Sequence, residues 1–337
     1  MARVGLMGFG RIGRNVFRLL QTEGLGEVAA IADVADPKAL TYLLKYDSIY
    51  GRFPKPVELE DDKLMVDGHA IPFINARQPG DVNWGELGID VVIQATGKYR
   101  TQEWCAKHIE AGAKRVILAS TPEEAGDVPI LLRGINDEIL TPDLGVISLG
   151  SNTSNALAPI LRIIDQQWGL ERAYFTTVHA FTNQARLADV PTSSFRSSRA
   201  AGENIIPATT NSPEIISAVM PELDGKLSAM ALNVPVPDGS TVDLVAFVGT
   251  ETTVEEVNET IRKEVAAGYA DVIEYVEDPI VSSDVIGSSQ SGNFDSLATL
   301  VVDGTMIKSI IWFDNGWGYS VRIVEVLNKI IEQLETT

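Results

Sequence analysis

The sequence predicts an α/β domain built on a parallel sheet, followed by a second domain of the α+β class. Three observations carry this prediction. The chain has 337 residues, more than one hydrophobic core usually serves, so two domains are expected. Up to about residue 150, short apolar runs alternate with helical patterns, which is typical of strands and helices around a parallel sheet. Beyond that point the strand-like runs are longer and rich in Val, Ala and Thr.

The first domain is expected to open with a strand, a glycine turn, a helix and a second strand. Residues 4–7 form a short apolar run directly before a glycine cluster, so they are expected to be a buried strand. Residues 14–21 have apolar side chains at helical spacing. The next strand is expected at 27–31, and Asp33 follows it. Later in the domain we expect strands at 89–95, 115–119 and 146–149, and a helix at 102–111.

The second domain is expected to hold a mixed or antiparallel sheet with helices between its strands. Strand-like runs occupy residues 174–180, 228–236, 241–249 and 306–313. Helical patterns occupy residues 160–167, 214–220 and 254–267. An amphipathic helix is expected over residues 320–334 at the end of the chain.

The glycine turn between the first strand and the first helix has the spacing of a dinucleotide site. In this pattern Gly8 permits the tight turn, Gly10 lets the backbone approach a pyrophosphate, and Gly13 lets the helix pack on the strand. Asp33 lies 20 residues after Gly13, where a carboxylate accepts hydrogen bonds from ribose hydroxyls and repels a 2′-phosphate. A turn that only joins a strand to a helix is the simpler alternative. The strand, helix, strand and acid together favour a Rossmann-type domain that binds NAD.

Composition and charge exclude several classes of function. The chain carries 27 Lys and Arg against 46 Asp and Glu, a formal net charge of −19, which disfavours binding to nucleic acid. Its one cysteine, Cys105, excludes an internal disulfide and a Cys-rich metal site. No apolar stretch is long enough to span a membrane, and the opening Met-Ala-Arg leads directly into a strand rather than a signal peptide. A cytoplasmic protein without a metal or membrane site is therefore expected.

Six segments along the chain then carry the motifs of one known family. They are Gly8-Phe9-Gly10-Arg11-Ile12-Gly13-Arg14, Leu43-Leu44-Lys45-Tyr46-Asp47-Ser48, Thr177-Val178-His179-Ala180-Phe181-Thr182-Asn183, Asn204-Ile205-Ile206-Pro207, Val281-Ser282-Ser283-Asp284, and Trp312-Phe313-Asp314-Asn315 with Trp317-Gly318-Tyr319-Ser320. With these motifs in this order, the chain resembles the phosphorylating glyceraldehyde-3-phosphate dehydrogenases over nearly its whole length. The resemblance implies an NAD-binding domain over residues 1–150 and 316–337, a catalytic domain over residues 151–315, and a homotetramer.

The resemblance also implies which residues hold the cofactor. Arg11 and Ile12 belong to the pyrophosphate turn, Asp33 takes the ribose position, and Asn315 takes the position that fixes the nicotinamide carboxamide, with Tyr319 nearby. The full implied set is Gly8, Gly10, Arg11, Ile12, Gly13, Asp33, Arg77, Thr96, Ser120, Asn315 and Tyr319.

The family's catalytic cysteine has no counterpart in this chain. The family segment Ser-Cys-Thr-Thr-Asn-Cys corresponds here to Ser151-Asn152-Thr153-Ser154-Asn155-Ala156, which places Asn152 at the nucleophile position. A thiolate attacks an aldehyde, whereas an amide nitrogen has its lone pair delocalised into the carbonyl and only forms hydrogen bonds. Cys105 lies in the expected helix over residues 102–111 and is interpreted as a small packed residue. The thioester chemistry is expected to be lost.

Further departures from the family lie on the substrate side. The Arg that binds the substrate phosphate is replaced by Asn233, a neutral partner. The family run Ser-Thr-Gly-Ala-Ala-Lys becomes residues 209–214, in which Asn211 replaces the glycine and Glu214 replaces the lysine. The implied substrate-binding set is Ser151, Thr153, Thr182, Arg196, Thr210, Asn211 and Asn233. A changed specificity, for a small molecule with or without an anionic group, is expected.

The role of His179 and the function of the protein both have alternatives that the sequence leaves open. His179 is either a general base aimed at the substrate or an inherited histidine that has lost its thiol partner. In the first hypothesis the protein is an altered NAD-dependent dehydrogenase with direct hydride transfer. In the second it is an inactive NAD-binding regulatory or assembly protein. In the third it oxidises the usual triose phosphate by another route. Whether it is an enzyme at all is left open by the sequence.

Overall fold

A computed structural model describes residues 2–23, 26–183 and 185–336 of the chain. The outer limits of the expected first domain, residues 1 and 337, lie outside this described part. The chain divides into two compact units. Unit 1 comprises Met1–Leu131, Asp137–Gly150 and Ser320–Thr337, and unit 2 comprises Leu132–Asn136 and Ser151–Tyr319.

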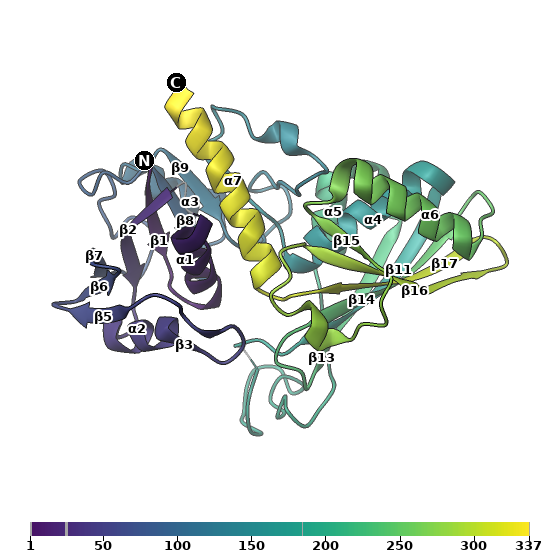
Figure 1. Cartoon of the computed structure of the whole chain (residues 1–337), viewed down its shortest axis with the longest axis horizontal. Helices are drawn as coiled ribbons and strands as arrows, with labels where there is room; N and C mark the ends of the chain where they lie inside the picture. Colours follow the sequence, from purple (N-terminus) through teal and green to yellow (C-terminus); the bar gives the residue numbers. More distant parts are fainter. Residues whose placement is uncertain (1, 24–25, 184, 337) are drawn as a thin grey trace. The chain divides into compact units, whose positions relative to one another are not determined.

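Unit 1 is built on an eight-stranded sheet with the order β10-β9-β8-β1-β2-β7-β6-β5 (Figure 1). Six neighbouring strands run parallel: β10 (Val146–Ser148), β9 (Arg115–Leu118), β8 (Val91–Gln94), β1 (Ala2–Met7), β2 (Gly26–Asp33) and β7 (His69–Asn75). The strands β5 (Val57–Glu60) and β6 (Lys63–Val66) extend the sheet in antiparallel pairing. The central strands are fully buried at Val4, Leu6, Ile31, Val92 and Ile93, as expected for a parallel sheet covered on both faces.

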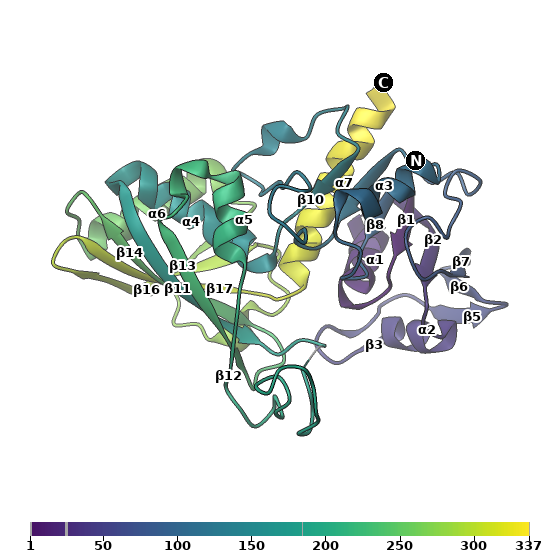
Figure 2. The ribbon, with the colours of Figure 1, turned by 180° about the vertical axis from the view of Figure 1, so that it is seen from behind.

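The helices of unit 1 lie on both faces of this sheet. In the view of Figure 1, α1 (Arg11–Glu23) lies in front of the central strands, and in the opposite view of Figure 2, α3 (Gln102–Glu110) lies in front. The remaining helical elements are α2 (Pro37–Lys45), a short 3-10 turn (Asp137–Ile139) and most of α7 (Trp317–Thr336). A small hairpin of β3 (Tyr46–Asp47) and β4 (Gly51–Arg52) follows α2. Unit 1 is therefore a doubly wound α/β domain.

The strand order of unit 1 reverses between β1 and β8. The chain proceeds from β1 through β2 to β7 on one side, and from β8 through β9 to β10 on the other. In open parallel sheets, ligands bind at the carboxyl ends of the strands at such a reversal. The fold thus marks the turns that follow β1 and β8 as the place to look for a cofactor site.

Unit 2 contains a seven-stranded mixed sheet with the order β12-β13-β11-β14-β17-β16-β15. The strands are β11 (Leu170–Ala180), β12 (Ile206–Ala208), β13 (Leu227–Val234), β14 (Ser240–Val248), β15 (Ile273–Val276), β16 (Gly292–Val302) and β17 (Met306–Phe313). Only β11–β13 and β15–β16 pair in parallel. Figures 1 and 2 show α4 (Asn152–Trp168), α5 (Ser212–Val219) and α6 (Val254–Glu264) over one face of this sheet.

The structure corrects three expected elements. The first sheet is not parallel throughout, because the β5–β6–β7 meander adds antiparallel strands to its edge. The helix expected at 160–167 begins at Asn152, because Ser151 caps it through a capping box with Ser154. The helix expected at 254–267 ends at Glu264 and continues as a π-helical turn, Val265–Tyr269. Short 3-10 turns at Pro221–Leu223 and Ser282–Val285 complete the elements.

Candidate active site and dinucleotide site

The expected cofactor residues of unit 1 follow the carboxyl ends of five adjacent parallel strands. Gly8 follows β1, Asp33 ends β2, Arg77 comes two residues after β7, Thr96 comes two residues after β8, and Ser120 comes two residues after β9. Because the carboxyl ends of parallel strands meet at one edge of a sheet, the fold brings these residues together. These residues are spread from residue 8 to residue 120 of the sequence, so the sheet topology is what brings them into one site.

The glycine turn after β1 leaves no room for side chains at two of its three glycines. Gly8 has a φ of +98°, and a Cβ there would lie 2.8 Å from Thr96 N. A Cβ on Gly13 would lie 2.2 Å from Gly8 O, so the first turn of α1 packs directly on the strand end. A Cβ on Gly10 would meet no atom within 4 Å among the described residues, so this backbone faces open space. The turn is therefore closely packed at Gly8 and Gly13 and open at Gly10, as the binding of a pyrophosphate requires.

Asp33 ties the glycine turn to the ends of β2 and β7. Its Oδ2 accepts a hydrogen bond from Phe9 N at 2.7 Å, and its Oδ1 accepts one from Ala35 N at 2.9 Å. Its backbone carbonyl accepts from Ala76 N at 3.3 Å, directly before Arg77. Each carboxylate oxygen keeps a lone pair beyond these bonds, so Asp33 is oriented and still able to accept from ribose hydroxyls.

Thr96 stands at the end of a buried hydrogen-bonded chain. Trp84 Nε1–H donates to His108 Nδ1 at 2.9 Å, which leaves the ring proton of His108 on Nε2, 3.3 Å from Gln94 Oε1. Gln94 Nε2 then donates to Thr96 Oγ1 at 3.0 Å and to Lys98 O at 3.1 Å. Burial lowers the pKa of His108 to about 4, so the ring is neutral at physiological pH. The network fixes the loop that follows β8.

Ser120 supplies a polar group with no partner at the same edge. Its carbonyl accepts from Ser148 Oγ at 2.8 Å, whereas its own Oγ is buried and has no hydrogen-bond partner in the described part of the chain. Buried hydroxyls are usually satisfied, so an unsatisfied one at the same edge of the sheet as Gly10 and Asp33 fits a polar ligand. The residues present thus fit a dinucleotide.

In unit 2, Asn152 begins α4 and uses both ends of its carboxamide. Its Oδ1 accepts from Thr153 N at 2.8 Å, and its Nδ2 donates to Asn315 O at 2.8 Å. The helix start is completed by Ser151 Oγ, which accepts from Ser154 N at 3.0 Å. Because one side-chain atom of Asn152 must accept and the other must donate, the assignment of Oδ1 and Nδ2 is fixed. Asn152 is therefore held in place as a donor and acceptor of hydrogen bonds.

His179 lies near the end of β11 and shares its surroundings with Asn315. His179 Nδ1 lies 2.6 Å from Ala180 O and 3.2 Å from Asn315 Nδ2. The shorter contact requires a proton on Nδ1, so we assign the lone pair to Nε2. Asn315 Nδ2 is also 3.5 Å from Ala180 O and donates there in this tautomer. Burial lowers the pKa of His179, while its hydrogen bond to Ala180 and the charge of Asp238 oppose that shift.

Two residues that the sequence analysis did not single out hold Asn315. Ser240 Oγ accepts from Ala180 N at 2.9 Å and donates to Asn315 Oδ1 at 2.7 Å. Asp238 Oδ1 accepts from Asn315 N at 2.9 Å, and both Asp238 and Ser240 are almost fully buried. The turn signal Pro237-Asp238-Gly239 was visible in the sequence, but the pairing of β14 with β17 is needed to place it beside Asn315.

The expected substrate residues are only partly brought together. Asn233 is the direct neighbour of His179 in the parallel pairing of β11 with β13. Thr182 and Arg196 are exposed on the segment 181–205, and Thr210 Oγ1 bonds to Ser212 Oγ at 2.9 Å beside the exposed Asn211. Across the described ranges, no hydrogen bond joins Arg196 or Thr210 to Asn152 or His179. Tyr319 is buried in the first turn of α7, and burial raises the pKa of its hydroxyl.

Cys105 does not replace the missing thiol. It is fully buried in α3 of unit 1, whereas His179 belongs to unit 2. Burial, with a smaller contribution from Asp127, raises the pKa of its thiol to about 12. A thiol of this kind is not ionised at neutral pH, so it is a packed core residue rather than a nucleophile.

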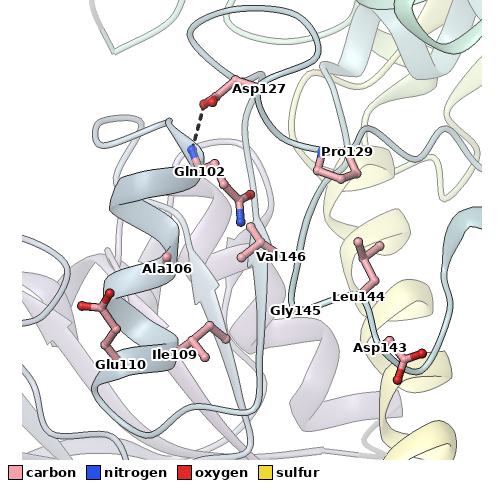
Figure 3. Close-up of a pocket in the computed structure, with 10 residues that line it drawn as sticks. All are labelled: Gln102, Ala106, Ile109, Glu110, Asp127, Pro129, Asp143, Leu144, Gly145 and Val146. Carbon is pink, nitrogen blue, oxygen red and sulfur yellow. Dashed lines mark hydrogen bonds between the residues drawn. The ribbon is translucent and has the colours of Figure 1, made fainter.

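Unit 1 also has a pocket of about 500 Å³ between α3 and the segments around residues 128 and 144. Figure 3 shows that Ile109 and Leu144 form its apolar wall, with the carboxylates of Glu110, Asp127 and Asp143 around it. None of the expected site residues lines it. Within the described part of the chain, no helix is long and apolar enough to cross a membrane, and no group of three or more His, Cys, Asp or Glu side chains is arranged to hold a metal ion.

Comparison with known proteins gives the family of both units. Residues 2–102 match the model of the NAD-binding domain of glyceraldehyde 3-phosphate dehydrogenase, and residues 151–315 match its C-terminal domain. The chain belongs to the glyceraldehyde-3-phosphate dehydrogenase family. It is 43% identical to the glyceraldehyde-3-phosphate dehydrogenase of Geobacillus stearothermophilus over 325 residues, 96% of each chain. It is 42% identical to glyceraldehyde-3-phosphate dehydrogenase 2 of Streptomyces avermitilis, covering 98% of this chain and 99% of the relative.

The family assignment confirms the fold class and the cofactor expected from the sequence. The protein has the Rossmann-type NAD-binding domain and the catalytic domain of this family of oxidoreductases, and its cofactor is NAD. The strand-end geometry of unit 1 gives the physical basis: a glycine turn open at Gly10, an oriented acid at Asp33 and an unsatisfied hydroxyl at Ser120.

Proposed function

We propose that this protein is an NAD-dependent oxidoreductase that has lost the thioester chemistry of its family and transfers hydride directly, with His179 as the base. The observation that carries the proposal is the pair of assignments at the start of α4 and the end of β11. His179 has its lone pair on Nε2, and the amide of Asn152 is committed to Thr153 N and Asn315 O. His179 can therefore act as a base, whereas Asn152 cannot act as a nucleophile.

The proposed step needs no covalent intermediate. His179 Nε2 accepts the hydroxyl proton of an alcohol or of an aldehyde hydrate. NAD would supply the acceptor for the hydride that leaves the same substrate carbon. The products are a carbonyl compound or an acid, NADH and a protonated His179. Because burial lowers the pKa of His179, its base form persists below the usual histidine range. The cofactor residues of unit 1 would hold NAD, and the family resemblance gives Asn315 the role of orienting its carboxamide.

Loss of thioester chemistry follows from the chemistry of an amide. The Asn152 nitrogen has no free lone pair for attack on an aldehyde carbon, and the sole thiol is the buried Cys105. Removing the nucleophile of an enzyme that works through a covalent intermediate costs on the order of a million-fold in rate. We propose a loss of this size for triose phosphate oxidation.

A changed specificity accompanies this loss. Asn233 stands beside His179 on β13, where the family places the arginine that binds the substrate phosphate. An arginine holds phosphate with a permanent charge and two parallel N–H donors, whereas Asn233 offers one neutral amide. Arg196 remains as a cation on the segment 181–205. We propose a small substrate or effector with at most one anionic group, bound with the help of Ser151, Thr153, Thr182, Thr210 and Asn211.

We also propose that the protein is a cytoplasmic homotetramer, as the family resemblance implies. The segment 181–205 supports assembly, because Leu187 and Phe195 are 95% and 90% exposed. Large apolar side chains this exposed on one segment make it a candidate interaction surface. Light scattering on the purified chain, compared with a Leu187→Ser/Phe195→Ser variant, tests this assembly; a monomeric wild-type protein would contradict it.

The test of the function is a screen of NAD reduction. Small hydroxy compounds and aldehydes, with and without a phosphate or carboxylate group, are offered to the NAD-loaded protein, and NADH is followed by absorbance. The proposal expects turnover of at least one compound, lowered about a hundredfold or more by His179→Gln. Silence across the panel with NAD bound would instead support the alternative of an inactive NAD-binding regulatory or assembly protein. Rapid oxidation of glyceraldehyde 3-phosphate would support the ordinary reaction by another route.

A further inference from the structure

The turn that carries Asn315 is held at three different atoms by three different residues. Its backbone N–H donates to Asp238 Oδ1 at 2.9 Å, and its side-chain Oδ1 accepts from Ser240 Oγ at 2.7 Å. Its backbone carbonyl accepts from Asn152 Nδ2 at 2.8 Å. Ser240 begins β14 and Asp238 lies two residues before it, whereas Asn152 comes from the start of α4. The Asn152 bond therefore joins the first turn of a helix to the turn after β17.

Asn152 is suited to this bond because its own orientation is fixed. Thr153 N donates to its Oδ1 at 2.8 Å, which turns Nδ2 toward Asn315 O. A cysteine at this position would make both contacts only weakly, since its one sulfur atom is a weak donor and a weak acceptor. A carboxylate of the same shape would place a negative oxygen against the Asn315 carbonyl. The amide is the side chain that joins these two backbone groups.

The Asn315 carboxamide keeps hydrogen-bonding capacity of its own. An amide has two N–H donors and two acceptor lone pairs. One N–H is directed to Ala180 O and one lone pair to Ser240 Oγ. One N–H donor and one acceptor lone pair remain on the Asn315 carboxamide. Together they can form a pair of hydrogen bonds with another carboxamide. Such a pair forms only when the Asn315 turn holds its side chain at a fixed height and angle.

We propose that Asn152 is a positioning residue for NAD, which braces the Asn315 turn so that the Asn315 carboxamide meets the carboxamide of the nicotinamide. This inference rests on the proposed role of Asn315 in the preceding section. In this proposal Asn152, at the family's nucleophile position, helps to orient the cofactor. This role also explains why an amide, rather than an inert small side chain, occupies that position.

The experiment compares two ligands that differ in the nicotinamide. NAD contains it, and ADP-ribose lacks it but keeps the groups that unit 1 binds. Calorimetry gives the Kd of each ligand for the wild-type protein and for Asn152→Ala. Loss of one hydrogen bond at the brace is expected to raise the Kd of NAD about fivefold. The Kd of ADP-ribose is expected to change by less than about twofold, because the variant leaves unit 1 untouched.

Two further variants make the comparison specific. Asn152→Asp keeps the shape but sets a carboxylate against Asn315 O, so it is expected to weaken NAD by about tenfold or more, again without effect on ADP-ribose. Asn258→Ala is the matched control, because Asn258 is also a half-buried amide of unit 2 that donates to a backbone carbonyl, Ser296 O, at 2.9 Å. This control is expected to bind both ligands as the wild-type protein does.

The outcomes separate this inference from the function it rests on. Equal losses for NAD and ADP-ribose, or no loss for either, would overturn the positioning role of Asn152. A wild-type protein that binds both ligands equally would overturn the role of Asn315, and one that binds neither would overturn the cofactor assignment itself. If Asn152→Ala is too unstable to measure, Ser240→Ala removes another of the three contacts and must give the same selective loss.

Discussion

His108 makes the stability of unit 1 depend on pH in a way that can be calculated. The ring is fully buried, accepts from the Trp84 indole and faces the amide of Gln94, so neither neighbour compensates a positive charge. Protonation would place a proton on Nδ1, where Trp84 already donates. Burial therefore lowers the pKa of His108 from 6.5 to about 4. The folded state resists protonation, and the unfolded state does not.

The magnitude follows from the difference between these two pKa values. Below pH 6.5 the unfolded chain takes up a proton that the folded chain refuses, so stability falls as the pH falls, until the folded state is also protonated near pH 4. A difference of two and a half units corresponds to about 3 kcal/mol in total. About 2 kcal/mol of this is lost between pH 7.5 and pH 5.

The assay is urea unfolding followed by circular dichroism at about pH 7.5 and about pH 5. His108→Gln keeps a hydrogen-bonding side chain but removes the titrating ring. It is expected to be less stable than the wild-type protein at the higher pH and to close that gap by about 2 kcal/mol at the lower pH. His69→Gln, which removes an exposed ring on β7, is the control and should keep the wild-type pH dependence. An unchanged gap for His108→Gln would refute the reasoning.

Three further predictions concern the cofactor turn, the nucleophile position and a helix start. Gly10→Ala should unfold like the wild-type protein yet bind NAD at least about tenfold more weakly. Gly13→Ala should also lower the melting temperature, because its Cβ would lie 2.2 Å from Gly8 O. Equal melting temperatures for the two variants would contradict this prediction. Asn152→Cys should not restore oxidation of glyceraldehyde 3-phosphate, and Asn152→Cys/Asn233→Arg should exceed it by about tenfold or more because a charged phosphate partner returns. Full activity of the single variant would contradict the altered anion site. Thr253→Ala should lower the free energy of unfolding in urea by about 1 kcal/mol, because Thr253 Oγ1 accepts a hydrogen bond from Glu256 N at the start of α6. An unchanged free energy of unfolding would show that this helix cap does not stabilise the protein.

The glycine turn and the acid at Asp33 were predictable because their chemistry is local. A buried run, three glycines at fixed spacing and a carboxylate after the next strand all lie within 33 residues. The β5–β6–β7 meander was missed, although Asp67 and Gly68 both adopt positive φ between β6 and β7, as the hairpin signal Asp-Gly predicts. The strands around it are short and half polar, so their apolar pattern was too weak to be recognised.

The early start of α4 could not be read from helical spacing alone. Pro159 lies inside the helix, and a proline usually ends a helical prediction. The burial of Ala156, Leu157 and Ile160 against the sheet outweighs this local penalty. The brace from Asn152 to Asn315 spans 163 positions of sequence, so no local pattern contains it. The candidate site residues thus come from the family motifs and stay a prediction, whereas their hydrogen bonds follow only from the fold.

The central claim is that NAD-linked oxidation proceeds here without a covalent enzyme intermediate. The most direct measurement mixes the NAD-loaded protein with a substrate found in the screen, follows NADH, and determines the intact mass of the chain during turnover. We expect NADH formation with an unchanged protein mass, and a turnover rate about a hundredfold or more lower in His179→Gln. A chain that gains the mass of an acyl group during turnover, or a His179→Gln variant with wild-type activity, would contradict it.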